Sequence, residues 1–189
     1  MFVNDGTGKF TEQSEALGLD DRGLGHGVAC FDYDNDGDLD LFIANSRGGP
    51  KLFRNDGGNN LGFLKINVVG SAPNTEGLGA RLVLRMNEGP AMQMREMICG
   101  NNFLSQNPSQ IHFGMGSSTS GELEIVWSNG VKMRFLDAQA NETLTVAQLP
   151  LSFDDSEVSF FQYLDQTISA LADYQAQGRL TADEATRIR

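Results

Sequence analysis

The most informative stretch of the sequence is Asp32-Tyr33-Asp34-Asn35-Asp36-Gly37-Asp38-Leu39-Asp40-Leu41. Its aspartates occupy alternate positions, so in a plain strand their carboxylates would project from one face and repel one another. A cation among them removes this cost, and Gly37 lets the chain turn sharply and gather the carboxylates around one point. An all-oxygen ligand set with room for about six to eight ligands favours Ca²⁺ over Mg²⁺.

The stretch opens like an EF-hand loop but does not continue as one. Counted from Asp32, the twelfth position is Ile43, where an EF-hand places a bidentate glutamate, and the flanks are strand-like rather than helical. The ninth position is therefore the expected closing ligand. The prediction is a calcium site with the main-chain carbonyl of Asp38 and four carboxylates, those of Asp32, Asp34, Asp36 and Asp40. The alternative is a solvated acidic turn that binds no ion.

Residues 1–60 contain a partial internal repeat. Asn-Asp-Gly follows an apolar residue at 4–6 and again at 55–57, and this tripeptide is typical of a tight hairpin turn. Short apolar strands are expected on both sides of the acidic loop and after it, at 27–31, 39–44 and 51–54. A period of about fifty residues built from short strands indicates a propeller-type repeat.

The acidic loop and its flanking strands resemble the FG-GAP or VCBS repeat, a blade of integrin-like β-propellers. The family pattern D-x-D-x-D-G-x-x-D is matched from Asp32 to Asp40. The resemblance implies Ca²⁺ held between two strands of a blade. A propeller closes with about four to eight blades, so we expect an incomplete blade. Such a unit docks on the following domain, pairs with another chain, or is the last blade of something longer.

Residues 61–149 are expected to form a second, all-β domain. Short strands alternate with turns rich in Gly, Asn, Pro and Ser, at 63–69, 81–86, 93–98, 110–113, 122–127, 132–136 and 143–146. This number and spacing predict a seven-strand sandwich or barrel-like domain. The fold class is therefore mainly β.

This second part resembles the ASPIC/UnbV domain, which follows VCBS repeats in cartilage acidic protein-like chains. The matching residues are Gly79-Ala80-Arg81, Gly100, Ser105-Gln106, His112-Phe113-Gly114-Met115-Gly116, Trp127-Ser128-Asn129-Gly130, Asn141 and Leu144. Met115 and Ser128 depart mildly from the family pattern. The resemblance implies an extracellular, periplasmic or other exported compartment, although no signal peptide precedes Phe2.

Residues 150–189 change to a helical pattern. Apolar side chains recur at helical spacing, at Val158, Phe161, Leu164, Ile168 and Leu171. Gly178 is the expected stop, and a capping box predicts a second helix over 182–189. The tail is thus predicted as a short helical hairpin that packs either on its own β-domain or on a partner.

Net charge and the length of apolar runs narrow the range of partners. The chain of 189 residues has a formal net charge of -11, which argues against nucleic acid or an anionic membrane as the main partner. No apolar run reaches transmembrane length.

Cys30 and Cys99 lie in apolar, strand-like contexts, which favours buried free thiols, and a single disulfide between them is the alternative.

The sequence predicts no catalytic residues and no cofactor other than Ca²⁺. It contains no nucleophile elbow, no His-x-x-x-His pair and no phosphate-binding glycine loop. The polar residues His112, Arg81 and Ser105 are interpreted as a hydrogen-bonded network that fixes long loops. The alternative is a carbohydrate-binding or hydrolytic site formed by the same three.

The predicted function is a non-catalytic, Ca²⁺-ordered β-protein that acts as a protein-interaction or assembly module. Its partner is expected to be a protein, a second copy of the chain or a glycan. The expected docking places are the open edge of the blade and the C-terminal helices.

Overall fold

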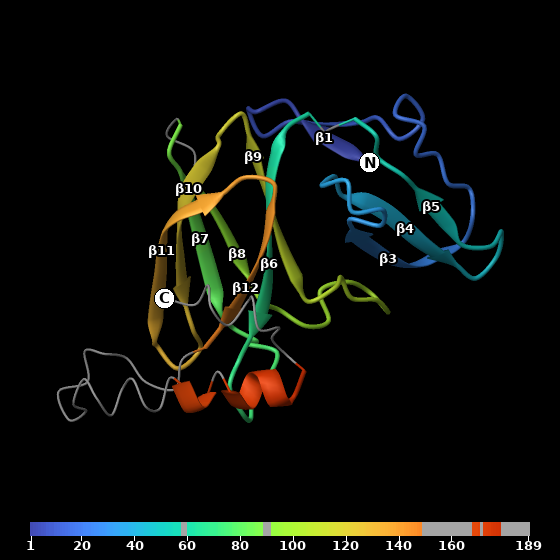
Figure 1. Ribbon diagram of the computed structural model, residues 1–189. Coiled ribbons are helices and arrows are strands. Elements are labelled where there is room, and N and C mark those ends of the chain that lie inside the picture. Colours follow the sequence, from blue (N-terminus) through green and yellow to red (C-terminus); the bar gives the residue numbers. More distant parts are fainter. Residues whose placement is uncertain (58–59, 89–91, 149–167, 171, 179–189) are drawn as a thin grey trace.

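The computed structural model describes residues 1–57, 60–88, 92–148, 168–170 and 172–178. Within these residues it is mainly β, with twelve strands in four sheets and one short helical segment (Figure 1). None of the four sheets closes into a barrel. The mainly β fold class predicted from the sequence is confirmed.

The second part of the chain forms a β-sandwich. Its strands are β6 (Gly62–Val69), β7 (Arg81–Met86), β8 (Met92–Glu96), β9 (Gln110–Gly116), β10 (Ser120–Val126), β11 (Lys132–Gln139) and β12 (Glu142–Ala147). One sheet has the antiparallel order β11-β10-β7-β8, and the other has the order β12-β6-β9, in which β12 and β6 run parallel. All seven strands predicted for this domain are present.

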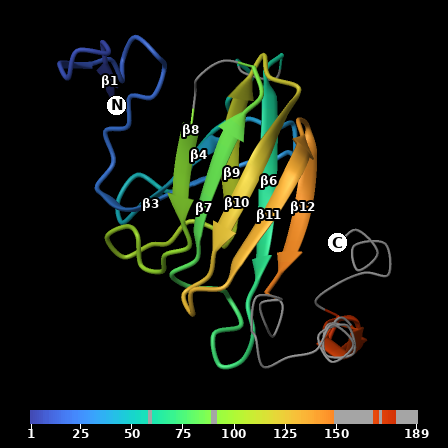
Figure 2. The same ribbon diagram turned by 90° about the vertical axis from the view of Figure 1, so that its left-hand side faces the viewer.

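One apolar core joins the two sheets of the sandwich. Alternate side chains of both sheets point into it, so that Leu64 and Ile66 of β6 lie in the same cluster as Leu123 and Ile125 of β10. Trp127, which follows β10, is also buried there. Figure 2 shows the strands of the sandwich running side by side. The two sheets therefore bury each other's apolar side chains, and all members of this core come from residues 64–146.

The first part of the chain forms two smaller sheets. Strands β3 (Gly25–Phe31), β4 (Asp40–Asn45) and β5 (Lys51–Phe53) form an antiparallel sheet in the order β3-β4-β5, which we call the blade. These are the three strands predicted around the acidic loop. Strands β1 (Phe2–Asn4) and β2 (Phe10–Glu12) form a separate hairpin. The predicted Asn-Asp-Gly turn connects them, with the Gly6 amide donating to Asn4 Oδ1 at 2.9 Å.

The blade has apolar side chains on both faces but no core of its own. The register places Val28, Cys30, Leu41, Ile43 and Phe53 on one face and Ala29, Phe31, Phe42 and Leu52 on the other. Among the described residues, every buried apolar side chain comes from position 64 or later. The blade is therefore stabilised mainly by the backbone hydrogen bonds between its strands and by polar contacts.

The described part of the tail is helical at 168–170 and 172–176 and ends at Gly178, where φ is +67°. Tyr174 is buried against Val69 and Ala147, and its hydroxyl lies 3.3 Å from the carbonyl oxygens of Gly70 and Gln148. Ile168, one of the apolar positions of the predicted helix, is 64% exposed. The helix instead anchors through Tyr174. The predicted second helix, 182–189, lies outside the described residues.

Candidate metal centre

The acidic loop lies between β3 and β4 and is shaped by hydrogen bonds from its own amides. The Gly37 amide donates to Asp32 Oδ2 at 3.1 Å, and the Asp38 amide donates to Asp36 Oδ1 at 2.9 Å. Gly37 has φ of +99°, a conformation that a glycine adopts at little cost. The loop therefore curls inward at the glycine, as its sequence predicts.

Asp40, the predicted closing ligand, is a buried structural carboxylate. Its Oδ2 accepts the Tyr33 amide at 2.7 Å and its Oδ1 accepts the Asn55 amide at 2.8 Å, and the residue is only 2% exposed. It thereby joins the beginning of the loop to the turn after β5. Each oxygen of this buried carboxylate thus accepts a hydrogen bond from a backbone amide.

Two groups of carboxylates could hold a cation within the described residues. Asp32, Asp34 and Asp40 form one group, and Asp34, Asp36 and Asp56 form the other, with the ligand oxygens of each group within 4.8 Å of one another. Asp38 belongs to neither group, although it is buried. Asp56, which sequence reasoning did not include, comes from the repeated Asn-Asp-Gly turn. That repetition was the signal that could have identified it.

The donor set fits a hard divalent cation. The side chain of Asp32 is 2% exposed, and its Oδ1 accepts no hydrogen bond from any described residue. An orphaned buried carboxylate oxygen is costly unless a cation or another donor reaches it. Because the Asp32 carboxylate lies in one group with those of Asp34 and Asp40, this group has the all-oxygen chemistry that Ca²⁺ prefers.

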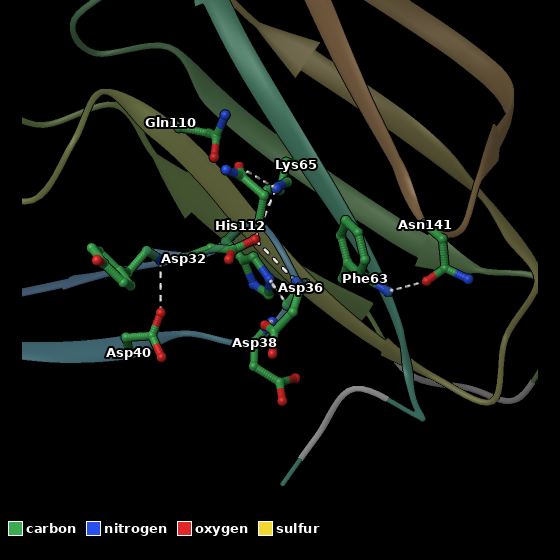
Figure 3. A network of polar contacts seen from close by, with 12 residues as sticks. Asp32, Asp36, Asp38, Asp40, Phe63, Lys65, Gln110, His112 and Asn141 are labelled. Carbon is green, nitrogen blue, oxygen red and sulfur yellow. Dashed lines mark hydrogen bonds and ion pairs between the residues drawn. The ribbon is translucent and has the colours of Figure 1, made fainter. Parts of the chain in front are cut away.

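The acidic loop packs on the outer face of the sandwich, against β6 and β9 (Figure 3). Lys65 Nζ donates to Asp32 Oδ2 at 2.8 Å, and His112 Nε2 donates to the Gly37 carbonyl oxygen at 2.8 Å. Phe63 stacks on His112 with ring centroids 6.1 Å apart and fills the space where a Cβ on residue 37 would lie. The glycine is thus required by both its φ and its close packing.

The charge of Lys65 also affects the acidity of the loop. Burial raises the pKa of Asp32, while the Lys65 ammonium and the Gly37 amide lower it, and the net result is a pKa below the usual value of 3.8. Asp32 is therefore ionised in the folded protein at neutral pH.

A loop of the sandwich covers the free edge of β3. Ser105 Oγ accepts the Val28 amide at 3.0 Å and donates to the Val28 carbonyl at 2.8 Å, while Asn107 Oδ1 accepts the Cys30 amide at 3.0 Å. Asn102 Nδ2 donates to the same Val28 carbonyl at 2.9 Å. These side chains replace a neighbouring strand, so this edge is not the open one that the sequence suggested. The other edge of the blade is β5, which pairs with β4 and with no further strand of the described residues.

The three residues considered for a catalytic or glycan site contact different parts of the molecule. His112 binds the loop, Ser105 binds the edge of β3, and Arg81 lies exposed at the start of β7. A groove of ≈ 620 Å³ lies between the blade and the sandwich and is lined by His112 but by neither of the other two. The interpretation of Ser105 and His112 as loop-fixing residues agrees with these contacts.

Cys30 and Cys99 are free thiols, but both are exposed. The prediction that they are buried is therefore wrong. Cys30 lies on a blade face that no described apolar layer covers, which is the reason that its apolar sequence context misleads.

Comparison with known families agrees with this geometry. The family model described as FG-GAP-like repeat matches residues 1–43 and 32–82, and the model described as ASPIC and UnbV matches residues 70–150. Together the two models match residues 1–150, with the FG-GAP-like repeat first and the ASPIC and UnbV domain second. The repeat includes the acidic loop and the blade, and the ASPIC and UnbV match includes all sandwich strands after β6.

The chain is also similar to part of several curated proteins. Cartilage acidic protein 1 of Homo sapiens is 27% identical over 134 residues, which are 69% of this chain and 20% of that protein. The Xenopus tropicalis protein of the same name is 30% identical over 115 residues, 57% of this chain and 17% of the relative. The chain thus spans about a fifth of the length of the curated relatives it matches.

Among solved structures, the major pilin subunit of Bacillus cereus aligns with 58% of this chain and 36% of its own at 14% identity, with a TM-score of 0.27. A likeness at this level carries no argument. No described helix is long and apolar enough to cross a bilayer.

Proposed function

We propose that the chain is a non-catalytic, calcium-ordered interaction module in which the FG-GAP-like blade binds another protein or a second copy of the chain. The observation that carries this proposal is the lack of a core in the blade. Its two faces present apolar side chains, and none of them is buried by the described residues. Val28, Cys30 and Leu52 are exposed and the other apolar side chains of the two faces are half-buried. Apolar faces that are left partly open in this way are typical of binding surfaces.

Ca²⁺ is the proposed cofactor, and the proposed metal residues are Asp32, Asp34, Asp36, Asp38 and Asp40. The orphaned oxygen of Asp32 and the exposed carboxylate of Asp34 are its first ligands, with Asp40 beside them. When bound, the ion supplies charge neutralisation between β3 and β4. It would stabilise the folded state by mass action, because the unfolded chain lacks the gathered carboxylates.

The docking surface is proposed on the faces of the blade and along β5. The edge of β3 is already bound by Asn102, Ser105 and Asn107, so a partner adds to the opposite side. We retain the division into a repeat at 1–60, a β-domain at 61–149 and a helical tail at 150–189 as part of this proposal. An exported, calcium-rich compartment is the proposed location, by analogy with the family.

The test is thermal unfolding in excess Ca²⁺ and in chelator, for the wild type and for Asp34→Asn. Asp34 belongs to both carboxylate groups and accepts no hydrogen bond from a backbone amide of the described residues, so its replacement removes a ligand with little other damage to the loop. At a Ca²⁺ concentration about a hundredfold above Kd, the midpoint should rise by several degrees. The variant should lose most of this rise.

Asp137→Asn on the exposed part of β11 is the matched control, because it makes the same charge change away from the loop.

Size measurement by light scattering should show self-association or a complex that weakens when Leu52 is replaced by aspartate. An unchanged midpoint with Ca²⁺ would reject the calcium site. A monomer whose behaviour does not depend on Leu52 would reject the blade as the self-association surface.

A further inference from the structure

The buried lysine of β6 is the feature that the proposed calcium site leaves unexplained. Strand alternation places Leu64 and Ile66 in the sandwich core and Lys65 on the outer face, where a lysine is normally solvated. Lys65 is instead only 5% exposed. It is buried because the acidic loop covers it.

The surroundings of Lys65 hold its ammonium group in place. Nζ donates to Asp32 Oδ2 at 2.8 Å, lies 3.5 Å from Asn35 Oδ1, and lies 5.3 Å from the centroid of the Phe63 ring. Its cross-strand neighbour on β9 is His112, which binds the Gly37 carbonyl. A salt bridge, an amide oxygen and an aromatic face thus surround one desolvated cation.

Asp32 is shared between this ammonium and the carboxylate group. Its Oδ2 faces Lys65 and Gly37, and its unpartnered Oδ1 belongs to the side chain that gathers with Asp34 and Asp40. A divalent cation at Oδ1 would therefore lie one carboxylate away from a fixed positive charge. Like charges at this separation repel, and the repulsion is stronger where water is excluded.

We propose that Lys65 is a resident counter-ion of the acidic loop that weakens the affinity of the loop for Ca²⁺ and keeps it docked on the sandwich in the absence of the ion. This inference rests on the proposed calcium site. The positive charge of Lys65 offsets part of the repulsion among the aspartates, so the ion-free loop does not splay. The same charge then opposes the entry of Ca²⁺, which places binding in a higher concentration range.

The test is calorimetric titration of the whole chain with Ca²⁺ alone, comparing the wild type with Lys65→Met, Lys65→Arg and Lys132→Met. Lys65→Met removes the charge but keeps an apolar stem, and Kd should fall roughly ten- to hundredfold. Lys65→Arg retains the charge and should stay near the wild-type Kd. Lys132→Met makes the same net charge change at an exposed position of β11 and should have little effect.

A second measurement follows unfolding in chelator for Lys65→Met, Asp32→Asn and the double variant. If the two side chains stabilise the ion-free loop together, the losses of unfolding free energy in the two single variants should add up to more than the loss in the double variant. The reason is that removing one partner leaves the other buried and unpaired. A Lys65→Met chain that folds only with Ca²⁺ would support the proposal. If it folds in neither condition, Lys65→Gln, which keeps a donor for Asp32 without the charge, replaces it in the titration.

The outcomes separate the two proposals. Tighter binding in Lys65→Met than in Lys132→Met supports the counter-ion role, and equal or weaker binding overturns it and leaves Lys65 as an ordinary structural partner. If neither the wild type nor any variant binds Ca²⁺, the calcium site itself is rejected, and the affinity part of this inference is rejected with it. The interaction energy between Lys65 and Asp32, measured from unfolding in chelator, would then still decide whether these two side chains hold the loop in place.

Discussion

The sandwich and the blade are built from similar apolar strands, but they bury them differently. Leu82 of β7 is 0% exposed and belongs to a cluster drawn from both sheets, whereas Leu52 of β5 is 41% exposed. The sandwich has two sheets to close around its side chains. The blade has one sheet, and one sheet cannot cover both of its own faces.

This difference explains why polar contacts dominate the first part of the chain. The acidic loop is attached to the sandwich by Lys65 and His112, and the edge of β3 is attached by Ser105 and its neighbours. The blade is therefore positioned through directional bonds to the sandwich. Its apolar faces stay partly exposed, as the proposed interaction module requires.

The largest expected effect compares matched leucines in the two regions. Leu82→Ala should lower the free energy of unfolding by about 2–5 kcal/mol, because it leaves a cavity in a closed core. Leu52→Ala should cost less than about 1 kcal/mol in the isolated chain. Denaturant titration of both variants measures the difference. Equal losses would mean that the blade has a closed core after all.

A smaller effect is expected at Gly37, where the two regions meet. Gly37→Ala requires an L-residue at φ +99° and a Cβ in the space of the Phe63 ring, so it should destabilise the docked loop by about 1–3 kcal/mol. Gly8→Ala is the control, because Gly8 has a similar φ of +89° but no atom within 4 Å of the added Cβ. Comparing unfolding midpoints isolates the packing contribution, and equal shifts would show that backbone strain alone is responsible.

Most of the architecture could be predicted from the sequence because it depends on local patterns. Alternation and turn residues identified the three blade strands and the seven sandwich strands, and the Asn-Asp-Gly signal located the β1–β2 turn. The aspartate spacing identified the loop, since Asp32, Asp34 and Asp40 do gather. Each of these features is determined within about ten residues of chain.

The contacts between the regions could not be predicted in this way, because they join residues far apart in the sequence. Lys65 sits at an outward position that normally predicts a solvated side chain, and only the docked loop buries it. Ser105 substitutes for a strand at the edge of β3 across 77 positions of sequence separation. Cys30 has an apolar context but remains exposed, because the layer that would cover it is not supplied by the described residues.

The smallest expected effect concerns acid, which should loosen the blade before the sandwich. Asp21 accepts hydrogen bonds from Lys51 and Asn45, and the Gly23 amide donates to it, so its pKa is lowered from 3.8 to about 2. Because the folded pKa lies below the ordinary value, the contribution of Asp21 to stability is complete above about pH 4 and is lost as the pH falls toward about 2.

Carboxyl NMR of Asp21 measures this pKa directly, and amide exchange at Lys51 and Leu82 compares the two regions over the same pH range. Exchange at Lys51 should accelerate first, because the blade depends on charged contacts, while Leu82 is held by an apolar core that does not titrate. Asp21→Asn should flatten the pH dependence at Lys51, and Asp20→Asn, next to it and paired only with exposed Arg22 among the described ion pairs, should not. Simultaneous loss of protection at both amides would mean that the blade and the sandwich unfold as one unit. The polar contacts of Lys65 and Ser105 between the two regions would then be stronger than their small number of hydrogen bonds indicates.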